Sequence, residues 1–217
     1  MTNTELTLLA VLLDRSGSMQ SIKSDTDGGF DAYIEEQRTL PGTIEVTLAQ
    51  FDTEYECVYA NLPIAQVPPL NLRPRGGTAL YDAVGKLVTE IGADLAARPE
   101  EQRPGTVIVI VLTDGHENSS REWTHEAVRS LITQQQEVYS WDFLFLGANM
   151  DAVQIGSQMG FDPRRSITYT AAPAGVAGAF RASAAYSARR RTAPAAAWGS
   201  GFSDAERADA QPGQEQV

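Results

Sequence analysis

Three short and almost entirely apolar runs constrain the fold of this chain more than any other feature. They cover residues 6–13 (LTLLAVLL), 106–113 (TVIVIVLT) and 143–146 (FLFL). Such runs are typical of strands that are buried on both faces of a parallel sheet. The run 44–51 (IEVTLAQF) instead alternates between apolar and polar residues, which indicates a half-buried strand nearer an edge. The segment 56–60 (ECVYA) is placed to pair back with it through a polar turn.

Helical patterns fill the intervals between these strands. Apolar residues follow a spacing of about 3.6 residues over four turns in the segment 80–95. Shorter patterns indicate helices at 30–34, at 128–132 with Thr124 as the candidate N-cap, and at 155–159. A last strand is expected at 167–170. Strands that alternate with helices predict right-handed crossovers and a doubly wound α/β sheet.

The composition changes after about residue 170 to Ala, Gly, Ser and Pro. A chain of 217 residues fits one domain with a tail. We therefore expect a domain over 4–170, a C-terminal helix over 171–191 and a flexible tail over 192–217. The basic triplet 189–191 is interpreted as a solvated helix end, where cations suit the helix dipole, rather than as a site for an acidic partner.

Charge and cysteine content exclude several classes of function. The chain has 28 acidic against 17 basic residues, a formal charge of −11, which argues against a nucleic-acid-binding surface. With one cysteine, Cys57, and two histidines, His116 and His125, it cannot build a cysteine or histidine metal site. A bound metal must therefore have oxygen ligands, which points to Mg²⁺, with Mn²⁺ and Ca²⁺ as alternatives. We expect Cys57 itself to be a small buried apolar residue.

Membrane and export signals are not predicted. No run approaches the roughly 20 apolar residues that a membrane span needs. The early run 6–13 has no basic residue before it and ends at Asp14-Arg15, unlike a signal peptide. We interpret it as a buried strand and expect a cytoplasmic protein with no membrane partner.

Side chains with oxygen atoms follow the predicted strands. Ligands bind beyond the carboxyl ends of the strands in open α/β sheets. Asp14, Ser16 and Ser18 follow the first apolar run, Asp114 follows the run 106–113, and Thr78 lies at the head of the helix 80–95. Two carboxylates match the charge of one divalent cation, and three hydroxyls add neutral ligands. Mg²⁺ binds roughly six oxygens and usually keeps water, so a position is left for an outside ligand.

These segments resemble the metal-ion-dependent adhesion site of von Willebrand factor type A domains. The family pattern is Asp-x-Ser-x-Ser, then a threonine, then an aspartate that is usually in Thr-Asp-Gly. All five positions are present here, in order, as Asp14, Ser16, Ser18, Thr78 and Asp114. The resemblance covers residues 4–170. It implies a doubly wound, mostly parallel six-stranded sheet with one antiparallel edge strand and helices on both faces.

The resemblance also implies a function. By this resemblance, Ser16, Ser18 and, with ligand bound, Thr78 would contact a divalent cation directly. Asp14 and Asp114 stand at positions that often act through water in the family. A glutamate or aspartate of a partner protein completes the metal shell. Such domains usually bind proteins and are not enzymes, and the chain looks like stand-alone intracellular bacterial or phage members. We expect a monomer.

Two other functions are weighed against this one. The first is a Mg²⁺-dependent phosphohydrolase or nucleotide-using enzyme on a similar sheet. Against it, Ser16 stands where a haloacid-dehalogenase-type phosphatase has its second aspartate, and the sequence contains no phosphate-binding glycine loop. The second is a structural scaffold that the metal stabilises. Near the predicted site, His116 and Glu117 are interpreted as solvent-exposed loop residues.

Overall fold

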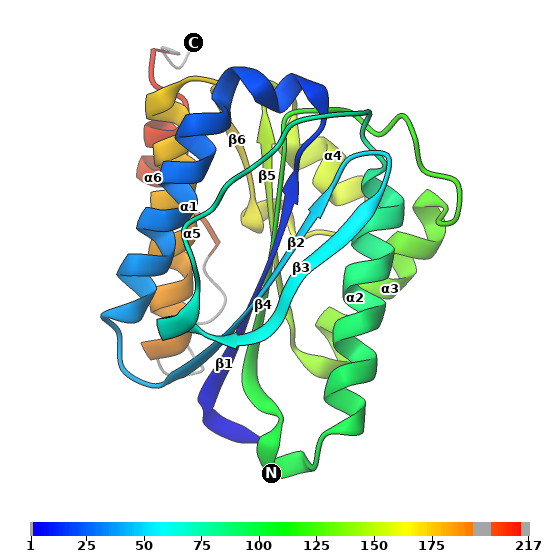
Figure 1. Ribbon diagram of the computed structural model, residues 1–217, viewed down its shortest axis with the longest axis vertical. Coiled ribbons are helices and arrows are strands. Elements are labelled where there is room, and N and C mark those ends of the chain that lie inside the picture. Colours follow the sequence, from blue (N-terminus) through cyan, green and yellow to red (C-terminus); the bar gives the residue numbers. More distant parts are fainter. Residues whose placement is uncertain (1, 193–200, 214–217) are drawn as a thin grey trace.

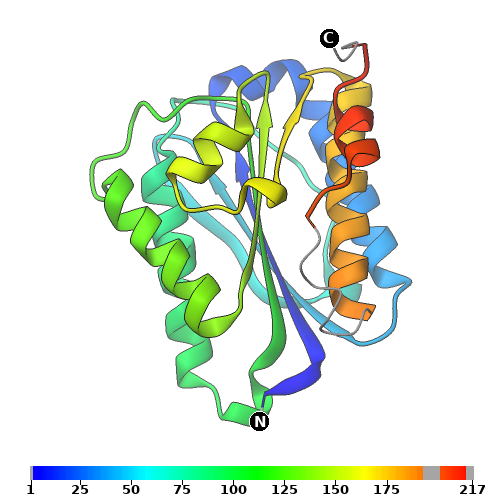
Figure 2. The same cartoon turned by 180° about the vertical axis from the view of Figure 1, so that it is seen from behind.

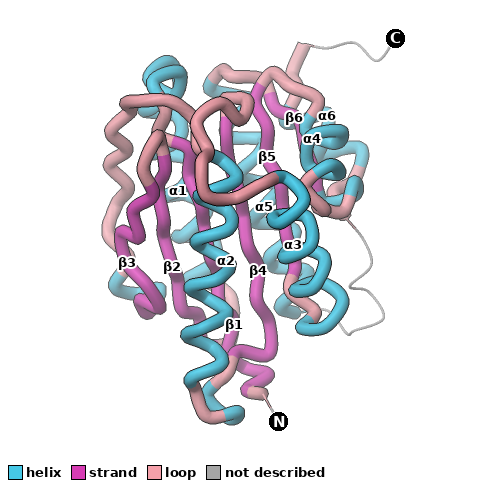
Figure 3. The backbone as a smooth tube through the Cα atoms, turned by 90° about the vertical axis from the view of Figure 1, so that its right-hand side faces the viewer, coloured by secondary structure: helices cyan, strands magenta, loops and turns pink. Residues whose placement is uncertain are grey.

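The computed structural model describes residues 2–192 and 201–213. Six strands form one sheet in the order β3-β2-β1-β4-β5-β6 (Figures 1 and 3). Their bounds are β1 Asn3–Asp14, β2 Thr43–Phe51, β3 Tyr55–Pro63, β4 Pro104–Thr113, β5 Asp142–Ala148 and β6 Ser166–Tyr169. The edge strand β3 is antiparallel to β2, and the other neighbours are parallel. The predicted fold class is thereby confirmed.

Helices cover both faces of this sheet (Figures 1 and 2). Those on one face are α1 (Lys23–Arg38), α5 (Pro173–Thr192) and α6 (Asp204–Ala210). Those on the other are α2 (Leu80–Ala97), α3 (His125–Tyr139) and α4 (Ala152–Gln158). Thr124 accepts a hydrogen bond from the Ala127 amide, so the predicted N-cap of α3 is confirmed. No described helix is long and apolar enough to cross a membrane.

The apolar runs bury side chains on both sides of the sheet, as predicted. Along β1, Leu9, Val11 and Leu13 pack in the core beneath α1 and α5. The alternate residues Leu8 and Leu12 pack in the core beneath α2 and α3. Fully burying one such side chain stabilises the fold by roughly 1.5–3 kcal/mol. β1 and β4 therefore lie in the middle of the sheet, and the loops after them start from buried strands.

The stretch 201–213 differs from the predicted tail. Residues Asp204–Ala210 form α6, and Ser203 and Glu206 make a reciprocal capping box at its start. Phe202 and Ala210 are buried in the core beside α5. The prediction of a flexible tail is wrong for this stretch, because two apolar side chains anchor it. The rest of the predicted tail, apart from Thr192 at the end of α5, covers residues 193–200 and 214–217, which lie outside the described residues.

Two predictions about single groups are also wrong. The basic triplet is not a solvated helix end, because Arg190 pairs with buried Asp142 and Arg189 Nη1 lies 2.7 Å from Glu206 Oε1. Arg191 donates to the Pro41 carbonyl. Cys57 is exposed rather than buried, because β3 lies at the edge of the sheet.

Candidate metal centre

The two candidate carboxylates lie at the same end of neighbouring strands. β1 and β4 are parallel, and their register pairs Leu13 with Leu112. Asp14 ends β1, and Asp114 follows the last residue of β4. The chain must leave both strands at the carboxyl edge of the sheet, so the two aspartates come together there.

The serines connect these carboxylates. The Ser16 amide donates to Asp14 Oδ1 at 2.6 Å, and Ser18 Oγ donates to Asp114 Oδ1 at 2.7 Å. The two serine hydroxyl oxygens are 3.1 Å apart. A short 3₁₀ helix, Gly17–Ile22, begins between them and turns Ser18 back toward Asp114. Four of the five predicted side chains thus form one connected group.

Thr78 is brought to the same place from the loop before α2. A Cβ atom added at Gly115 would lie 2.7 Å from Thr78 Oγ1 and 3.6 Å from Asp14 Oδ2. The threonine hydroxyl and the Asp14 carboxylate therefore both approach Gly115. A larger residue at this position would collide with Thr78, which explains the Asp-Gly pair. The Thr78 amide is held by Asn118 Oδ1 at 2.9 Å.

The electrostatics of this group favour a cation. Asp14 has no exposed surface, and burial raises its pKa to about 6 although Thr113 and Ser16 donate hydrogen bonds to it. Burial also raises the pKa of Asp114. A buried carboxylate without a positive partner is costly. Within residues 2–192 and 201–213 no group of three or more Asp, Glu, His or Cys side chains is placed to hold a metal. Hydroxyl oxygens would therefore complete the shell, and this donor set fits a hard cation.

Supporting residues surround the five. Thr113 Oγ1 donates to Asp14 Oδ2 at 2.6 Å and accepts from the Gly115 amide. Glu117 is not a solvated charge, because it accepts from the amides of Tyr81, Ser119 and Ser120. The sequence offered no signal for these contacts, since they depend on how the loop after Asp114 folds over α2. His116 is exposed, as predicted.

A polar cleft adjoins the group. Its volume is about 670 Å³, and Thr53, Glu54, Lys86, Asn118 and Arg121 are among the residues that line it. Asn118 also holds Thr78, so the cleft begins beside the candidate centre. A ligand that reaches the five side chains has room to continue into this cleft.

Comparisons with known proteins give the fold a name. No family model matches the sequence, and no curated protein matches it. Solved structures do match. One is a von Willebrand factor type A protein from Catenulispora acidiphila, with 16% identity, a TM-score of 0.57, and coverage of 84% of this chain and 42% of that one. Another is proximal thread matrix protein 1 from the mussel byssus with a zinc-occupied metal-ion-dependent adhesion site, with 15% identity, a TM-score of 0.57, and coverage of 81% and 46%.

A third match is the von Willebrand factor domain of a type V pili tip protein from Porphyromonas gingivalis. It has 11% identity, a TM-score of 0.55, and coverage of 82% of this chain and 94% of that one. This chain spans less than half the length of the first two proteins. The fold is thus that of a von Willebrand factor type A domain, as the sequence resemblance implied.

Proposed function

We propose that this chain is a metal-dependent protein-binding module. Asp14, Ser16, Ser18, Thr78 and Asp114 would hold a divalent cation, and a glutamate or aspartate of a partner protein would complete its shell. The observation that carries this proposal is the convergence of three separate loops, with two carboxylates and three hydroxyls, at the carboxyl edge of the sheet.

The donor set suits this role. Hydroxyls are neutral ligands, so they leave more of the positive charge of the cation available to an incoming carboxylate. The exposed Ser18 and the half-buried Asp114 lie on the open side of the group, whereas Asp14 and Thr78 are buried. A partner would therefore approach over Ser18 and Asp114. The bound cation would supply the positive charge that attracts the partner's carboxylate.

We propose Mg²⁺ as the cation, with Mn²⁺ and Ca²⁺ as alternatives. All five side chains offer oxygen, and oxygen ligands suit these hard cations. The zinc in the mussel protein belongs to that protein and shows that a site of this kind can accept another divalent ion.

The proposal is tested first by metal binding. Calorimetric titration of the metal-free protein with MgCl₂ is expected to show one site. Ser16→Ala is expected to weaken binding at least tenfold while its circular dichroism spectrum stays that of the wild type. A wild-type protein that binds none of Mg²⁺, Mn²⁺ and Ca²⁺ would refute the proposal.

Partner binding is tested second. A partner captured from cell extract in Mg²⁺ should be released by EDTA and should not be captured by Ser16→Ala. Capture that neither change affects would remove the metal from the mechanism. A Mg²⁺-dependent phosphatase or nucleotidase activity that is lost in Asp114→Ala would instead favour the enzyme hypothesis.

Other features of the proposal rest on the sequence. We propose that the module acts as a monomer and that it works in the cytoplasm. We also propose that it does not bind nucleic acid, because the chain is strongly acidic. We also propose that residues 4–170 form the binding domain and that the helix α5 accompanies it.

A further inference from the structure

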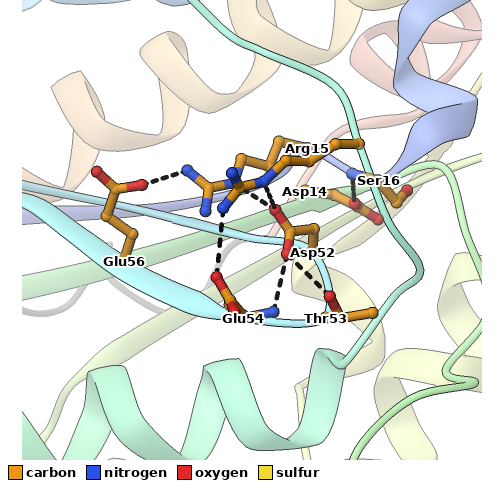
Figure 4. A network of polar contacts seen from close by, with 8 residues as sticks. Asp14, Arg15, Ser16, Asp52, Thr53, Glu54 and Glu56 are labelled. Atoms are coloured by element: carbon orange, nitrogen blue, oxygen red, sulfur yellow. Dashed lines mark hydrogen bonds and ion pairs between the residues drawn. The ribbon is translucent and has the colours of Figure 1, made fainter.

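An ionic cluster with a buried centre lies beside the candidate metal centre (Figure 4). Its middle is Asp52, which follows β2 and whose side chain is 2% exposed. Asp52 Oδ2 accepts from Arg15 Nε and from Arg75 Nε, each at 2.8 Å. Its other oxygen, Oδ1, accepts from the Glu54 amide at 2.8 Å. One carboxylate therefore holds two arginines that are 60 residues apart in the chain.

Both arginines belong to loops that carry candidate metal ligands. Arg15 stands between Asp14 and Ser16, and Arg75 stands three residues before Thr78. In Figure 4 the Arg15 side chain extends toward Asp52, away from Asp14 and Ser16. The carboxylate thus holds the first loop from the side opposite to its ligand atoms.

Backbone hydrogen bonds join the same three segments. The Arg75 amide donates to the Arg15 carbonyl at 2.7 Å, and the Ala79 amide donates to the Asp52 carbonyl at 2.8 Å. The Gly17 amide donates to the Gly76 carbonyl at 3.2 Å. Ala79 directly follows Thr78, so both the main chain and the side chain of Asp52 act on the ligand-bearing loops.

Gly76 shows how closely these loops approach. Its φ is +68°, a conformation that favours glycine. A Cβ atom there would lie 3.2 Å from Thr53 Oγ1 and 3.3 Å from Asp52 Cβ. The main chain just before Thr78 therefore packs closely against the turn that contains Asp52.

The charges explain why this arrangement needs an aspartate. The Arg15 side chain is 7% exposed, so its cation needs a partner. Its other carboxylate contact, Glu56, has a side chain that is 55% exposed. Burial raises the pKa of Asp52. The hydrogen bonds that it accepts from Arg75, the Glu54 amide and Arg15 lower the pKa by more, so the pKa lies below its ordinary value. Asp52 is therefore ionised at neutral pH and balances the buried guanidinium.

We propose that Asp52 is a positioning residue for the metal centre, because it clamps Arg15 and Arg75 and so holds the loop of Ser16 and Ser18 in register with Thr78. This inference rests on the proposed function of the site. It assigns to Asp52 a role in cation affinity that goes beyond its contribution to folding.

The test compares Asp52→Asn with Glu54→Gln. Both substitutions remove one negative charge from the same turn, but Glu54 is 77% exposed and its amide still donates to Asp52 in the variant. The Mg²⁺ dissociation constant is measured by calorimetry at a temperature where both metal-free proteins are folded, and their melting temperatures are measured separately. Asp52→Asn is expected to raise the dissociation constant at least tenfold, and Glu54→Gln less than twofold.

The outcomes separate the two proposals. A wild-type affinity in Asp52→Asn, with only a lower melting temperature, would make Asp52 a structural residue and overturn the inference. An equal weakening in both variants would also overturn it, because the charge alone would then matter. If Asp52→Asn does not fold, Arg75→Gln takes its place, since that side chain is 59% exposed. Its dissociation constant is expected to rise about threefold, and an unchanged value would overturn the inference. A wild-type protein without Mg²⁺ affinity would refute the proposed function itself.

Discussion

Ser18 differs from the other candidate ligands because it is exposed and joins Ser16 to Asp114 through one hydroxyl. Its neighbour Ser21 is also exposed, but its hydroxyl donates back to the Ser18 carbonyl and not to a candidate ligand atom. The two serines lie on the same 3₁₀ helix. They therefore offer a matched pair for testing which hydroxyl contributes to the site.

Ser18→Ala is expected to raise the Mg²⁺ dissociation constant at least tenfold, because it removes one neutral oxygen ligand. Ser21→Ala is expected to leave this constant unchanged. Calorimetric titration of both variants checks the prediction, and equal affinities would place Ser18 outside the metal shell. Neither variant should unfold more easily by more than about 0.5 kcal/mol, because both side chains are exposed.

Asp82 gives the stability of the fold a pH dependence. Its carboxylate accepts hydrogen bonds from the amides of Arg121, Glu122 and Trp123 at 2.7–2.9 Å. Burial raises its pKa, but the three amides lower it by more, so the pKa of Asp82 lies below the ordinary value of an aspartate. The unfolded chain therefore takes up the proton first as the pH falls. The stabilisation is complete above the unfolded value and disappears as the pH falls through the folded one.

Asp82→Asn is expected to lower the free energy of unfolding by about 1–2 kcal/mol at pH 7, because a charged acceptor is lost. The difference from wild type should shrink below about pH 4. Urea unfolding at pH 7 and pH 3 measures both quantities, with the exposed Glu101→Gln as the control. A difference at pH 3 as large as that at pH 7 would show that the charge of Asp82 is not its source.

The convergence of the five candidate side chains could be predicted from the sequence, because each lies within four residues of the end of a buried strand or the start of a helix. Asp52 also directly follows a strand, so its place at this edge was predictable, but its contacts were not, and Glu117 gave no such signal. Asp52 acts on a residue 37 positions earlier, and its contacts depend on the side-by-side placement of β1 and β2. Residue types and their spacing predict which side chains come together at a sheet edge. They do not predict which charged residues hold the loops of those side chains through ion pairs and hydrogen bonds.

At the scale of elements, helix α2 packs against the loop before α3 through a glycine. A Cβ atom added at Gly85 would lie 2.1 Å from Trp123 Cδ2. At Gly92, two turns later on the same helix, such a Cβ would have no atom of the described residues within 4 Å. The glycine at 85 therefore permits a close contact, whereas the one at 92 only lowers helix propensity.

Gly85→Ala is expected to destabilise the protein by roughly 1–3 kcal/mol, because the indole must move. Gly92→Ala is expected to stabilise it by about 0.5–1 kcal/mol, because alanine loses less backbone entropy in a helix. Urea unfolding of the two variants checks the opposite signs. A stable Gly85→Ala protein would mean that Trp123 moves away at little cost.

The strands and helices themselves were predictable because their patterns are long and regular. The apolar runs of β1, β4 and β5 identify buried strands without any knowledge of their neighbours. The burial of Cys57 was predicted wrongly because it depends on the position of β3 in the sheet. An edge strand leaves side chains exposed that the same residues would bury in a central strand.

At the scale of the whole molecule, the C-terminal segment closes one side of the sheet. Phe202 packs against Tyr186 of α5 with ring centroids 6.0 Å apart, and its amide donates to the Arg164 carbonyl at 2.8 Å. The composition of residues 201–213, with its Ala, Gly, Asp and Gln residues, resembles that of a flexible tail. Sequence patterns therefore could not predict this packing. Two buried side chains, Phe202 and Ala210, are too few to produce a periodic signal.

Phe202→Ala tests whether the segment belongs to the folded domain. Removing a buried phenylalanine costs about 3–5 kcal/mol when its surroundings cannot collapse around the cavity. We expect a loss of about 3 kcal/mol in the free energy of unfolding, in one cooperative transition. The control Tyr139→Ala removes an aromatic side chain that is 59% exposed, and a change within about 0.5 kcal/mol is expected for it. Equal stability of the two variants in urea would mean that residues 201–213 do not fold with the domain. The apolar surface of α5 that Phe202 covers would then be exposed to solvent.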